Sequence, residues 1–297
     1  MEKLSHRLLS EIRQRRRVIA IVKDCRRAML LPFLAYAGIR LVVELAFRRR
    51  RIALVHFGDP LVAWCAPVCA VFRVPSLITV HGLDVTFGNR LYQRLTDLSL
   101  NGVDRLVCIS AAAREACLRR GIPAKRLVII HPGVDPPRRA SREAAREVLA
   151  GRLGLDLRDV SVLLTVGRLV RRKGVAWFVE HVVPLLRESD TQFLYLVAGI
   201  GPDEGQIRQT ADRLGLGDSV RLVGQVSDGD LAVCMAAADM FVMPNIRVPG
   251  DMEGFGLVAL EAAACGLPVI ASGLEGIREA ITNGENGILV PAGDAEA

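Results

Sequence analysis

The clearest candidates for chemistry are two glutamates, Glu253 and Glu261, which enclose seven residues of a glycine-rich and apolar segment. Gly254 and Gly256 stand at the start of a helical pattern that runs to about Cys265, where Gly-Leu-Pro ends it. The N-terminus of such a helix presents unpaired N–H groups and the positive end of the helix dipole. We therefore expect a phosphate to bind there.

The spacing of the two glutamates sets a distance along the expected helix. Glu261 lies roughly 7–8 Å into it at a rise of about 1.5 Å per residue, so the carboxylates would flank a bound diphosphate. Carboxylates accept hydrogen bonds from sugar hydroxyls. A nucleotide-sugar fits, with the hexose at Glu253 and the ribose at Glu261. The alternative is an ordinary solvent-facing acidic pair, which the glycines on both sides of Phe255 disfavour.

A second candidate segment is basic and runs from Gly167-Arg168 to Lys173-Gly174. Arg168 and Lys173 are donors suited to a diphosphate, the first as a fork and the second as a point charge. They would also stabilise a departing nucleoside diphosphate. We expect Arg171 and Arg172, which lie between them, to form a solvated basic turn. The segment lacks the glycine spacing of a Walker loop.

His81-Gly82 follows an apolar run, Ser76–Val80. A histidine at the carboxyl end of a strand can donate to a sugar hydroxyl or take part in proton transfer, although a lone histidine is more often structural.

His131 fits a turn between domains. Gly199-Ile-Gly201 has the wrong spacing for a dinucleotide fingerprint, which argues against an oxidoreductase.

Other chemistry finds little support in the residues. The sequence contains no serine elbow, no His-Glu-x-x-His and no aspartate-rich metal cluster, and we expect neither a metal nor a cofactor. Aromatic residues are 5% of the chain. Without stacking aromatics beside it, the Arg48–Arg51 run favours a solvated helix end over nucleic-acid binding.

The elements that must position these residues alternate between short apolar strands and longer helices. The helical patterns include Leu91–Leu100, Ala111–Arg120 and Arg142–Ala150. Strand–helix alternation predicts right-handed crossovers and parallel sheets with both faces covered. The expected strands are Val18–Val22, Ile52–Val55, Ser76–Val80, Arg105–Ile109, Leu127–Ile130, Ser161–Val166, Gln192–Ala198, Val220–Val223, Met240–Met243, Val269–Ala271 and Ile288–Val290.

We predict an α/β fold of two doubly wound, Rossmann-like domains that face a cleft. The polar stretch Pro132–Ser141 is the expected linker, and the domains would be residues 1–135 and 136–297. Such sheets bind ligands beyond the carboxyl ends of their strands. Most of the expected strands run into glycine there, which lets the backbone approach a ligand closely.

Charge is distributed unevenly over the 297 residues. Residues 1–150 contain 27 Lys and Arg against 12 Asp and Glu, whereas residues 151–297 contain 12 against 20. The basic half favours an anionic or membrane-borne acceptor.

Seven cysteines, none in Cys-x-x-Cys, indicate free and mostly buried thiols in a reducing cytoplasm. A metal site at Cys65 and Cys69 is the lesser alternative.

No secretory leader pattern opens the chain, because its first 17 residues are rich in charge. The most apolar stretch, Ala28–Phe47, contains Pro32, Arg40 and Glu44, which make it a poor spanning helix. We expect an amphipathic helix there, packed on a core or lying on a membrane surface. Peripheral association with the inner face of a membrane is therefore expected alongside a cytoplasmic location.

Taken together, these motifs resemble the retaining GT-B glycosyltransferases of family 4, also called group 1. The resemblance rests on Glu253 to Glu261 with Gly-Phe-Gly and Gly-Leu-Pro, on Gly167-Arg168 with Lys173, on His81-Gly82 and on Ile130-His-Pro-Gly-Val-Asp135. It covers most of the chain, and the segment with the two glutamates is its most specific part.

The resemblance implies transfer of a hexosyl group from a nucleoside-diphosphate sugar to a hydroxyl acceptor, with retention and without a metal ion. The acceptor would be a glycan or a lipid-linked sugar, such as a cell-envelope polysaccharide. Glu253 would contact the hexose, Glu261 the ribose, and Arg168 and Lys173 the diphosphate beside Gly167. His81 would lie near the reacting sugar. The backbone donors would be Phe255, Gly256 and Leu257, and Gly224 with Gln225 would hold the base.

Two departures from the family pattern shape a further expectation. Family members begin with a strand and a Gly-Gly loop, whereas residues 1–9 resemble the helix that follows that loop. The family also continues beyond the segment Gly287–Asp294 into closing helices. We therefore expect a fragment shortened at both ends. A truncated nucleotide-binding module without transferase activity is the alternative function.

Overall fold

A computed structural model describes residues 2–22, 29–135, 141–189 and 191–297, with side chains described from residue 8 onward. The chain divides into two compact units between Pro132 and Gly133, three residues before the division that the sequence suggests. Residues 136–140 of the expected linker and Cys25 lie outside the described residues.

Unit 1 is built on a four-stranded parallel sheet in which the strands follow one another in chain order. Its core includes Ile78 and Leu106, which are fully buried. The strands are β1 (Val55–Phe57), β2 (Ser76–Val80), β3 (Arg105–Cys108) and β4 (Leu127–Ile129). The helices are α1 (Glu2–Arg15), α2 (Leu30–Arg48), α3 (Pro67–Val71), α4 (Leu83–Thr86), α5 (Arg90–Gly102) and α6 (Ala111–Arg119).

Unit 2 contains a six-stranded parallel sheet of order β10-β9-β8-β5-β6-β7. The chain therefore starts in the middle of the sheet, builds outward to one edge, and returns to build outward to the other edge. The topological switch point lies between β5 and β8, where open α/β sheets bind ligands. The strands are β5 (Ser161–Val166), β6 (Phe193–Ala198), β7 (Val220–Gly224), β8 (Met240–Met243), β9 (Val269–Ser272) and β10 (Ile288–Val290).

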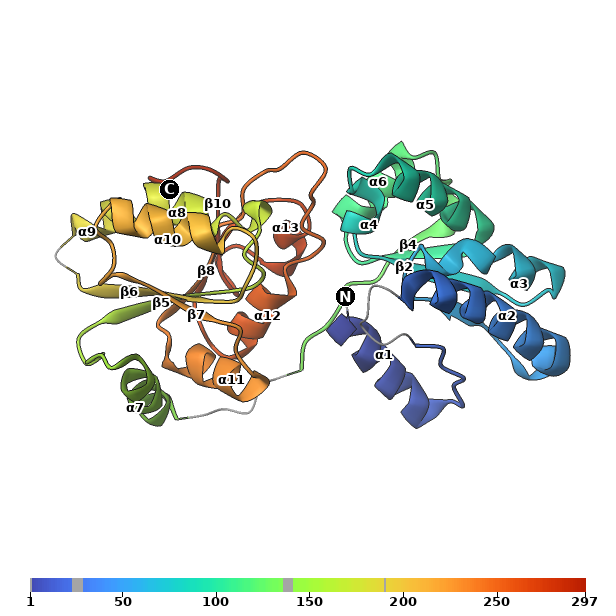
Figure 1. Cartoon of the computed structure of the whole chain (residues 1–297), viewed down its shortest axis with the longest axis horizontal. Helices are drawn as coiled ribbons and strands as arrows, with labels where there is room; N and C mark the ends of the chain where they lie inside the picture. The colour runs from blue at the N-terminus through green and yellow to red at the C-terminus, as the bar shows by residue number, and fades with distance from the viewer. Residues whose placement is uncertain (1, 23–28, 136–140, 190) are drawn as a thin grey trace. The chain divides into compact units, whose positions relative to one another are not determined.

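Helices cover both faces of the second sheet. In Figure 1, α8 and α10 lie on one face, and α7 and α11 lie on the opposite face. Both faces are therefore apolar, and Leu194, Tyr195 and Leu196 of β6 are all buried although they alternate in direction. The helices are α7 (Arg142–Leu153), α8 (Val175–His181), α9 (Val183–Arg187), α10 (Glu204–Arg213), α11 (Asp228–Ala237), α12 (Leu257–Ala264) and α13 (Ile277–Ala280).

The predicted alternation of strands and helices is confirmed, with one strand wrong. Ten of the eleven expected strands form, four of them with the predicted bounds, and β1 starts at the last residue of its prediction. Val18–Val22 forms no strand in the described residues, and Ile19 and Val22 are exposed. An apolar run becomes a strand only where a neighbouring strand pairs with it, and here none does.

The expected helix at Ala28–Phe47 forms as α2, Leu30–Arg48. Together with the short 3-10 turn η2 (Arg49–Arg51), it is one helix in the described residues that is long and apolar enough to cross a membrane by length and composition alone. Only 28% of its apolar window is buried.

The described cysteines are free, and five of them are buried as expected: Cys65, Cys69, Cys108, Cys117 and Cys234.

Candidate active site

The loops that leave β5 and β8 meet beside the switch point of unit 2, and a glycine allows them to do so. Gly174 ends the turn η5 (Arg171–Lys173) with a φ of 67°. A Cβ atom at this position would overlap the carbonyl group of Pro244, which follows β8. The absence of a side chain at Gly174 therefore lets the basic turn lie against the β8 loop.

The loops that leave β5 and β8 both place side chains against the carboxylate of Glu253. Its carboxylate oxygen Oε2 lies 2.7 Å from Lys173 Nζ and 3.4 Å from Arg172 Nε. The side-chain amide of Asn245 donates to the same oxygen at 3.1 Å. Arg172 also pairs with Asp251 at 2.9 Å. The carboxylate thus lies among two cations and one amide, drawn from both loops.

The charge state of Glu253 follows from these partners. Burial alone would raise the pKa of Glu253, but the charges of Lys173 and Arg172 and the hydrogen bonds from Lys173 and Asn245 outweigh burial and hold the pKa below its ordinary value. Glu253 is therefore an ionised, nearly enclosed acceptor at neutral pH. Such a carboxylate can accept hydrogen bonds from hydroxyl groups without first losing a proton.

A second carboxylate fixes the backbone at this position. Glu275 accepts a hydrogen bond from the backbone N–H of Glu253 at 2.5 Å. Burial raises the pKa of Glu275, and the negative charge of Glu253 raises it further. Glu275 itself has a φ of 45°, and a Cβ at the following Gly276 would overlap the carbonyl of Gly254. The loop after β9 is thereby packed directly on the Gly-Phe-Gly segment.

The helix that follows this segment begins where the sequence predicts. Gly256 adopts a φ of 82° as the N-cap of α12, a conformation that favours glycine. No side chain caps the helix, so its first N–H groups are not satisfied by the N-cap residue. Phe255 is buried, Leu257 is the first helical residue, and Glu261 lies half-buried one turn further on.

The loops after β5, β6 and β7 form a neighbouring part of the same edge. A Cβ at Gly199 would overlap the carbonyl of Gly167, and the N–H of Gly199 donates to the carbonyl of Gly224 at 2.7 Å. These three strand exits therefore lie backbone against backbone. Arg168 is exposed beside them, and Gln225 is exposed after β7.

One residue in the basic turn departs from the sequence expectation. Arg171 is exposed as predicted, but the prediction of a solvated Arg172 is wrong. The Arg172 side chain is only 14% exposed, because Asp251 and Glu253 draw the guanidinium inward. Its pairing with two carboxylates keeps a cation beside Lys173 without uncompensated charge.

His81 lies in unit 1, at the carboxyl end of β2, and is buried. Its backbone N–H donates to Asp84 at 2.8 Å. The imidazole ring is hydrogen-bonded to the backbone of Gly58, whereas its Nε2 atom has no hydrogen-bond partner among the described residues. Burial lowers the pKa of His81 to about 4, so the ring is neutral near pH 7 and Nε2 is its acceptor nitrogen.

Polar groups surround His81 at this edge of the first sheet. Burial raises the pKa of Asp59, which follows β1, and the Asp84 carboxylate raises it further. Burial lowers the pKa of His56, and the neighbouring His81 lowers it too. His56 is hydrogen-bonded to the hydroxyl of Thr79 at 2.9 Å. The edge thus carries two imidazoles and two carboxylates.

Sequence reasoning gave no role to Asn245, Asp251 or Glu275. Asn245 was visible as part of a strand exit, Met243-Pro244-Asn245, and it is fully buried with Oδ1 unpartnered in the described part of the chain. That atom and Nε2 of His81 are two of the buried side-chain atoms for which the described residues supply no hydrogen-bond partner. Glu275 carries no pattern of its own, because its role depends on the folding of the β9 loop onto Glu253.

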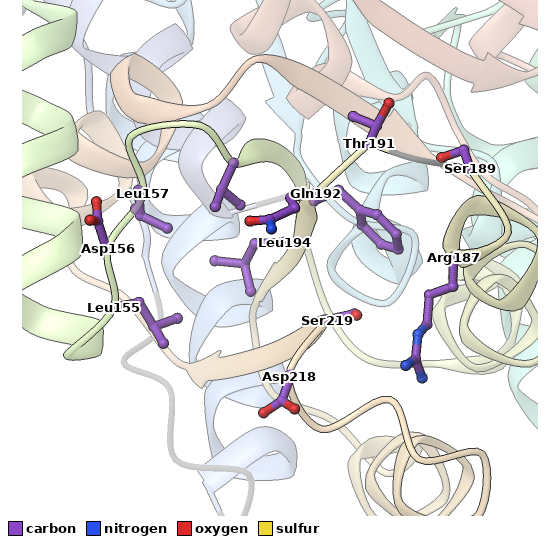
Figure 2. Close-up of a pocket in the computed structure, with 12 residues that line it drawn as sticks. Leu155, Asp156, Leu157, Arg187, Ser189, Thr191, Gln192, Leu194, Asp218 and Ser219 are labelled. Atoms are coloured by element: carbon purple, nitrogen blue, oxygen red, sulfur yellow. The ribbon is translucent and has the colours of Figure 1, made fainter.

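A pocket of about 370 Å³ lies elsewhere in unit 2, and Figure 2 shows its lining. Residues that precede β5, β6 and β7 form it, including Asp156, Thr191 and Asp218. It therefore opens at the amino ends of the strands, the edge opposite to Glu253.

Among the described residues, no group of three or more His, Cys, Asp or Glu could hold a metal ion.

Comparison with known families places both halves of the chain in one class. Residues 160–297 match the model described as glycosyl transferases group 1, and residues 4–138 match the model described as glycosyltransferase family 4. Among solved structures, HepE of Anabaena in complex with UDP and glucose aligns with a TM-score of 0.72 at 21% identity, over 92% of this chain and 72% of that one. Sucrose-phosphate synthase from Thermosynechococcus elongatus aligns with a TM-score of 0.68 at 28% identity, over 93% and 69%.

Curated relatives point the same way. The amylovoran biosynthesis glycosyltransferase AmsK of Erwinia amylovora is 30% identical over 83% of this chain and 59% of its own length. The GDP-mannose-dependent alpha-(1-6)-phosphatidylinositol monomannoside mannosyltransferase of Mycobacterium tuberculosis is 36% identical over 72% and 56%. The chain spans less than two thirds of the length of these relatives. From the two family models, these relatives and the α/β fold of its two parallel-sheet units, the chain belongs to the group 1 glycosyltransferases, with the GT-B fold.

Proposed function

We propose that this chain is a hexosyltransferase, which moves a hexosyl group from a nucleoside-diphosphate sugar to a hydroxyl acceptor with retention at the anomeric carbon. The observation that carries the proposal is the ionised Glu253, held by Lys173, Arg172 and Asn245 beside the switch point of unit 2. An enclosed carboxylate next to cations suits a ligand with both hydroxyl groups and phosphates.

The donor is assigned by chemical class. HepE was solved with UDP and glucose, and the mycobacterial relative is GDP-mannose-dependent by name. Those facts concern the relatives, and they support a nucleoside-diphosphate sugar as the donor here. In this proposal Glu253 binds the hexose and Glu261 binds the ribose. Gly224 and Gln225, at the exit of β7, lie near the base.

The reaction breaks the bond between the anomeric carbon and the β-phosphate oxygen. The acceptor oxygen forms the new bond to that carbon, and the proton of the acceptor hydroxyl passes to the departing phosphate oxygen. The diphosphate leaves with the electron pair of the broken bond. Arg168, Lys173 and the N–H groups of Phe255, Gly256 and Leu257 stabilise that charge, as preorganised donors do where charge develops. Lys173 exchanges part of its contact with Glu253 for the phosphate. We expect no metal ion to be needed.

The acceptor side of the proposal belongs to unit 1. With Nε2 unpartnered and the ring neutral, His81 can accept a hydrogen bond from a hydroxyl group near the reacting sugar. We propose a glycan or lipid-linked acceptor and a site of action on the cytoplasmic side of a membrane. One relative is named for amylovoran biosynthesis and another for phosphatidylinositol monomannoside, and these names support a glycan or lipid-linked acceptor here.

The direct test is transfer by the purified chain. UDP-, GDP- and ADP-hexoses are supplied with a glycan or lipid extract, and the released nucleoside diphosphate is measured. The account expects release that depends on the acceptor, and a product whose anomeric coupling in proton NMR matches the donor. A product of opposite configuration would contradict retention. Nucleotide binding without any transfer would favour the alternative, a nucleotide-binding module.

A further inference from the structure

The outward side of α2 in unit 1 is apolar without interruption and open to solvent. Leu31, Ile39 and Phe47 are 77%, 67% and 84% exposed. At about 100° per residue, they share one arc of the helix. The other exposed residues of this arc are also uncharged: Pro32, Ala35, Tyr36, Val42, Val43 and Ala46.

The opposite side of α2 is committed to the core of unit 1. Ala37, Leu41 and Leu45 are buried, and α2 packs beside α3, as Figure 1 shows. A helix that is apolar on all sides is normally enclosed by protein or lipid. Here the protein encloses one side only, and among the described residues nothing covers the outward arc.

The charged residues within α2 are confined to one flank. Arg40, Glu44 and Arg48 follow one another at intervals of four residues, and Glu44 pairs with both arginines at 2.6 Å and 2.9 Å. These charges satisfy one another along the side of the helix. They leave the outward arc free of charge along its length.

Cations gather at the end of the same helix. Arg49, Arg50 and Arg51 are exposed, and the described part of the chain shows no ion pair for any of them. They begin two residues after Phe47, the most exposed apolar side chain of the arc. Near the other border of the arc, the ring of Trp64 packs on Gly38 and stays half-exposed. In an interfacial helix, the apolar face lies at the acyl boundary, and aromatic rings and cations lie at the level of the lipid headgroups. The apolar arc of α2, with an aromatic ring and cations at its borders, has this arrangement.

We propose that α2 docks unit 1 onto an anionic membrane surface, with the helix lying in the plane of the interface. The arc of Leu31, Ile39 and Phe47 enters the acyl boundary, and Arg49–Arg51 contact lipid phosphates. The helix does not span the bilayer, because its inner side, with Leu41 and Leu45, is buried within unit 1, where α2 packs beside α3. Residues 1–132, which form unit 1, contain 23 Lys and Arg against 9 Asp and Glu, and this basic surplus adds a long-range attraction to the same surface. Unit 1 alone carries this proposal, which is independent of nucleotide binding.

The test is cosedimentation of the chain with vesicles of phosphatidylcholine, with and without phosphatidylglycerol. We expect binding to the anionic vesicles, which decreases as salt is added. The double variant Ile39→Ser/Phe47→Ser should bind about 100-fold more weakly, because burial of each of these side chains contributes roughly a factor of ten. The matched control is Val148→Ser/Leu185→Ser, which removes two exposed apolar side chains from unit 2 and should bind like the parent chain.

A second variant separates docking from folding. In a Trp64→Phe/Trp177→Phe background, which removes both native tryptophans, Phe47→Trp places the single fluorophore at an exposed position of the arc, and we expect vesicles with brominated acyl chains to quench it. Leu185→Trp in the same background places the fluorophore on unit 2, and it should not be quenched. No binding to anionic vesicles, or binding that the double serine variant leaves unchanged, would overturn the proposal. So would a stable dimer of the lipid-free chain that the same double variant dissociates, since a second copy would then cover the arc.

Discussion

Glu253 accepts charged or polar contacts from three side chains, and Arg172 links it to Asp251. Such a residue has two separable effects when it is changed. Removal of its charge leaves the mostly buried Lys173 without the carboxylate that pairs with it, while Arg172 keeps Asp251, and this costs stability. It also removes the acceptor that the account assigns to the hexose, which costs turnover. The two effects can be told apart because one is read in the absence of ligand.

Glu253→Gln should lower the turnover number of transfer by about 100-fold or more, the scale seen when one preorganised polar group of an active site is removed. The amide keeps the shape of the side chain and loses its charge. Steady-state kinetics with a saturating donor give the measurement. Glu188→Gln, at an exposed position after α9, is the control and should leave the rate unchanged. Near-normal turnover of the Glu253 variant would remove this residue from the mechanism.

The lowered pKa of His81 predicts the direction in which stability changes with pH. Burial lowers the pKa of His81 from 6.5 to about 4, so the unfolded chain binds this proton at a higher pH than the folded chain does. Stability should therefore fall as the pH drops from about 6.5 toward 4. Chemical denaturation across this range measures the slope. His81→Asn should show a shallower slope, and an equal slope in both proteins would contradict the neutral, buried ring.

Residue types predicted some of this site and missed the rest for physical reasons. The glycine pattern around Phe255 places Glu253 at a helix start, and the structure has it there. Arg172 was expected in solvent because a run of basic residues carries no information about a distant Asp251. Glu275 was not foreseen, because its contact with Glu253 exists only once the β9 loop has folded back.

At the scale of elements, the site depends on strand exits that touch through their backbones. Gly174, Gly199 and Gly276 each lie where a Cβ would overlap a carbonyl of a neighbouring loop. The strands themselves are not special, since apolar runs of this kind occur throughout the chain. What distinguishes this edge is that glycines let the loops after β5, β8 and β9 approach one another.

Gly174→Ala should separate the basic turn from the β8 loop and weaken nucleotide binding by tenfold or more, because a displacement of about 1 Å at an active site has effects of this size or greater. Gly215→Ala is a matched control. Its φ of 64° resembles the 67° of Gly174, but open space surrounds its Cβ position. Both variants should lose about 1–2 kcal/mol of stability from backbone strain. Equal nucleotide affinity in the two variants would show that the loop contact does not matter.

The elements were largely predictable because strands and helices of this fold have distinct local patterns. Short, wholly apolar runs mark strands covered on both faces, and β5 and β8 formed with the predicted bounds. Val18–Val22 has the same pattern and no partner strand, so it stayed irregular. Strand pairing is a long-range property that local composition does not contain. The order of the sheet around the switch point likewise emerged only from the structure.

At the scale of the whole molecule, the chain combines a basic unit and an acidic one. Residues 1–132 carry a surplus of 14 positive charges and residues 133–297 a surplus of 7 negative ones, from 23 Lys and Arg against 9 Asp and Glu in the first and 16 against 23 in the second. An acidic unit that binds a diphosphate must concentrate its cations locally, and Arg168, Arg172 and Lys173 do so at one edge. The basic unit is free to meet an anionic acceptor surface.

Association with that surface should depend on ionic strength. Exposed charges are screened beyond a Debye length of about 8–10 Å near physiological salt. Binding of the whole chain to anionic vesicles should therefore weaken as salt rises, whereas nucleotide affinity at the enclosed Glu253 site should change less. Parallel titrations at low and high salt measure both. Equal salt sensitivity of the two would contradict the assignment of acceptor and donor to differently charged units.

The most direct test of the central claim, that unit 2 binds a nucleoside diphosphate with its ribose at Glu261, is thermal unfolding of the chain with UDP, GDP, ADP or NAD. A ligand at about 100 times its dissociation constant stabilises the folded state by about 2.7 kcal/mol. We predict that one nucleoside diphosphate raises the unfolding temperature, that Glu261→Ala weakens this shift, and that NAD has no effect. No shift with any nucleoside diphosphate in a cooperatively folded sample, or an equal shift with NAD, would contradict the account.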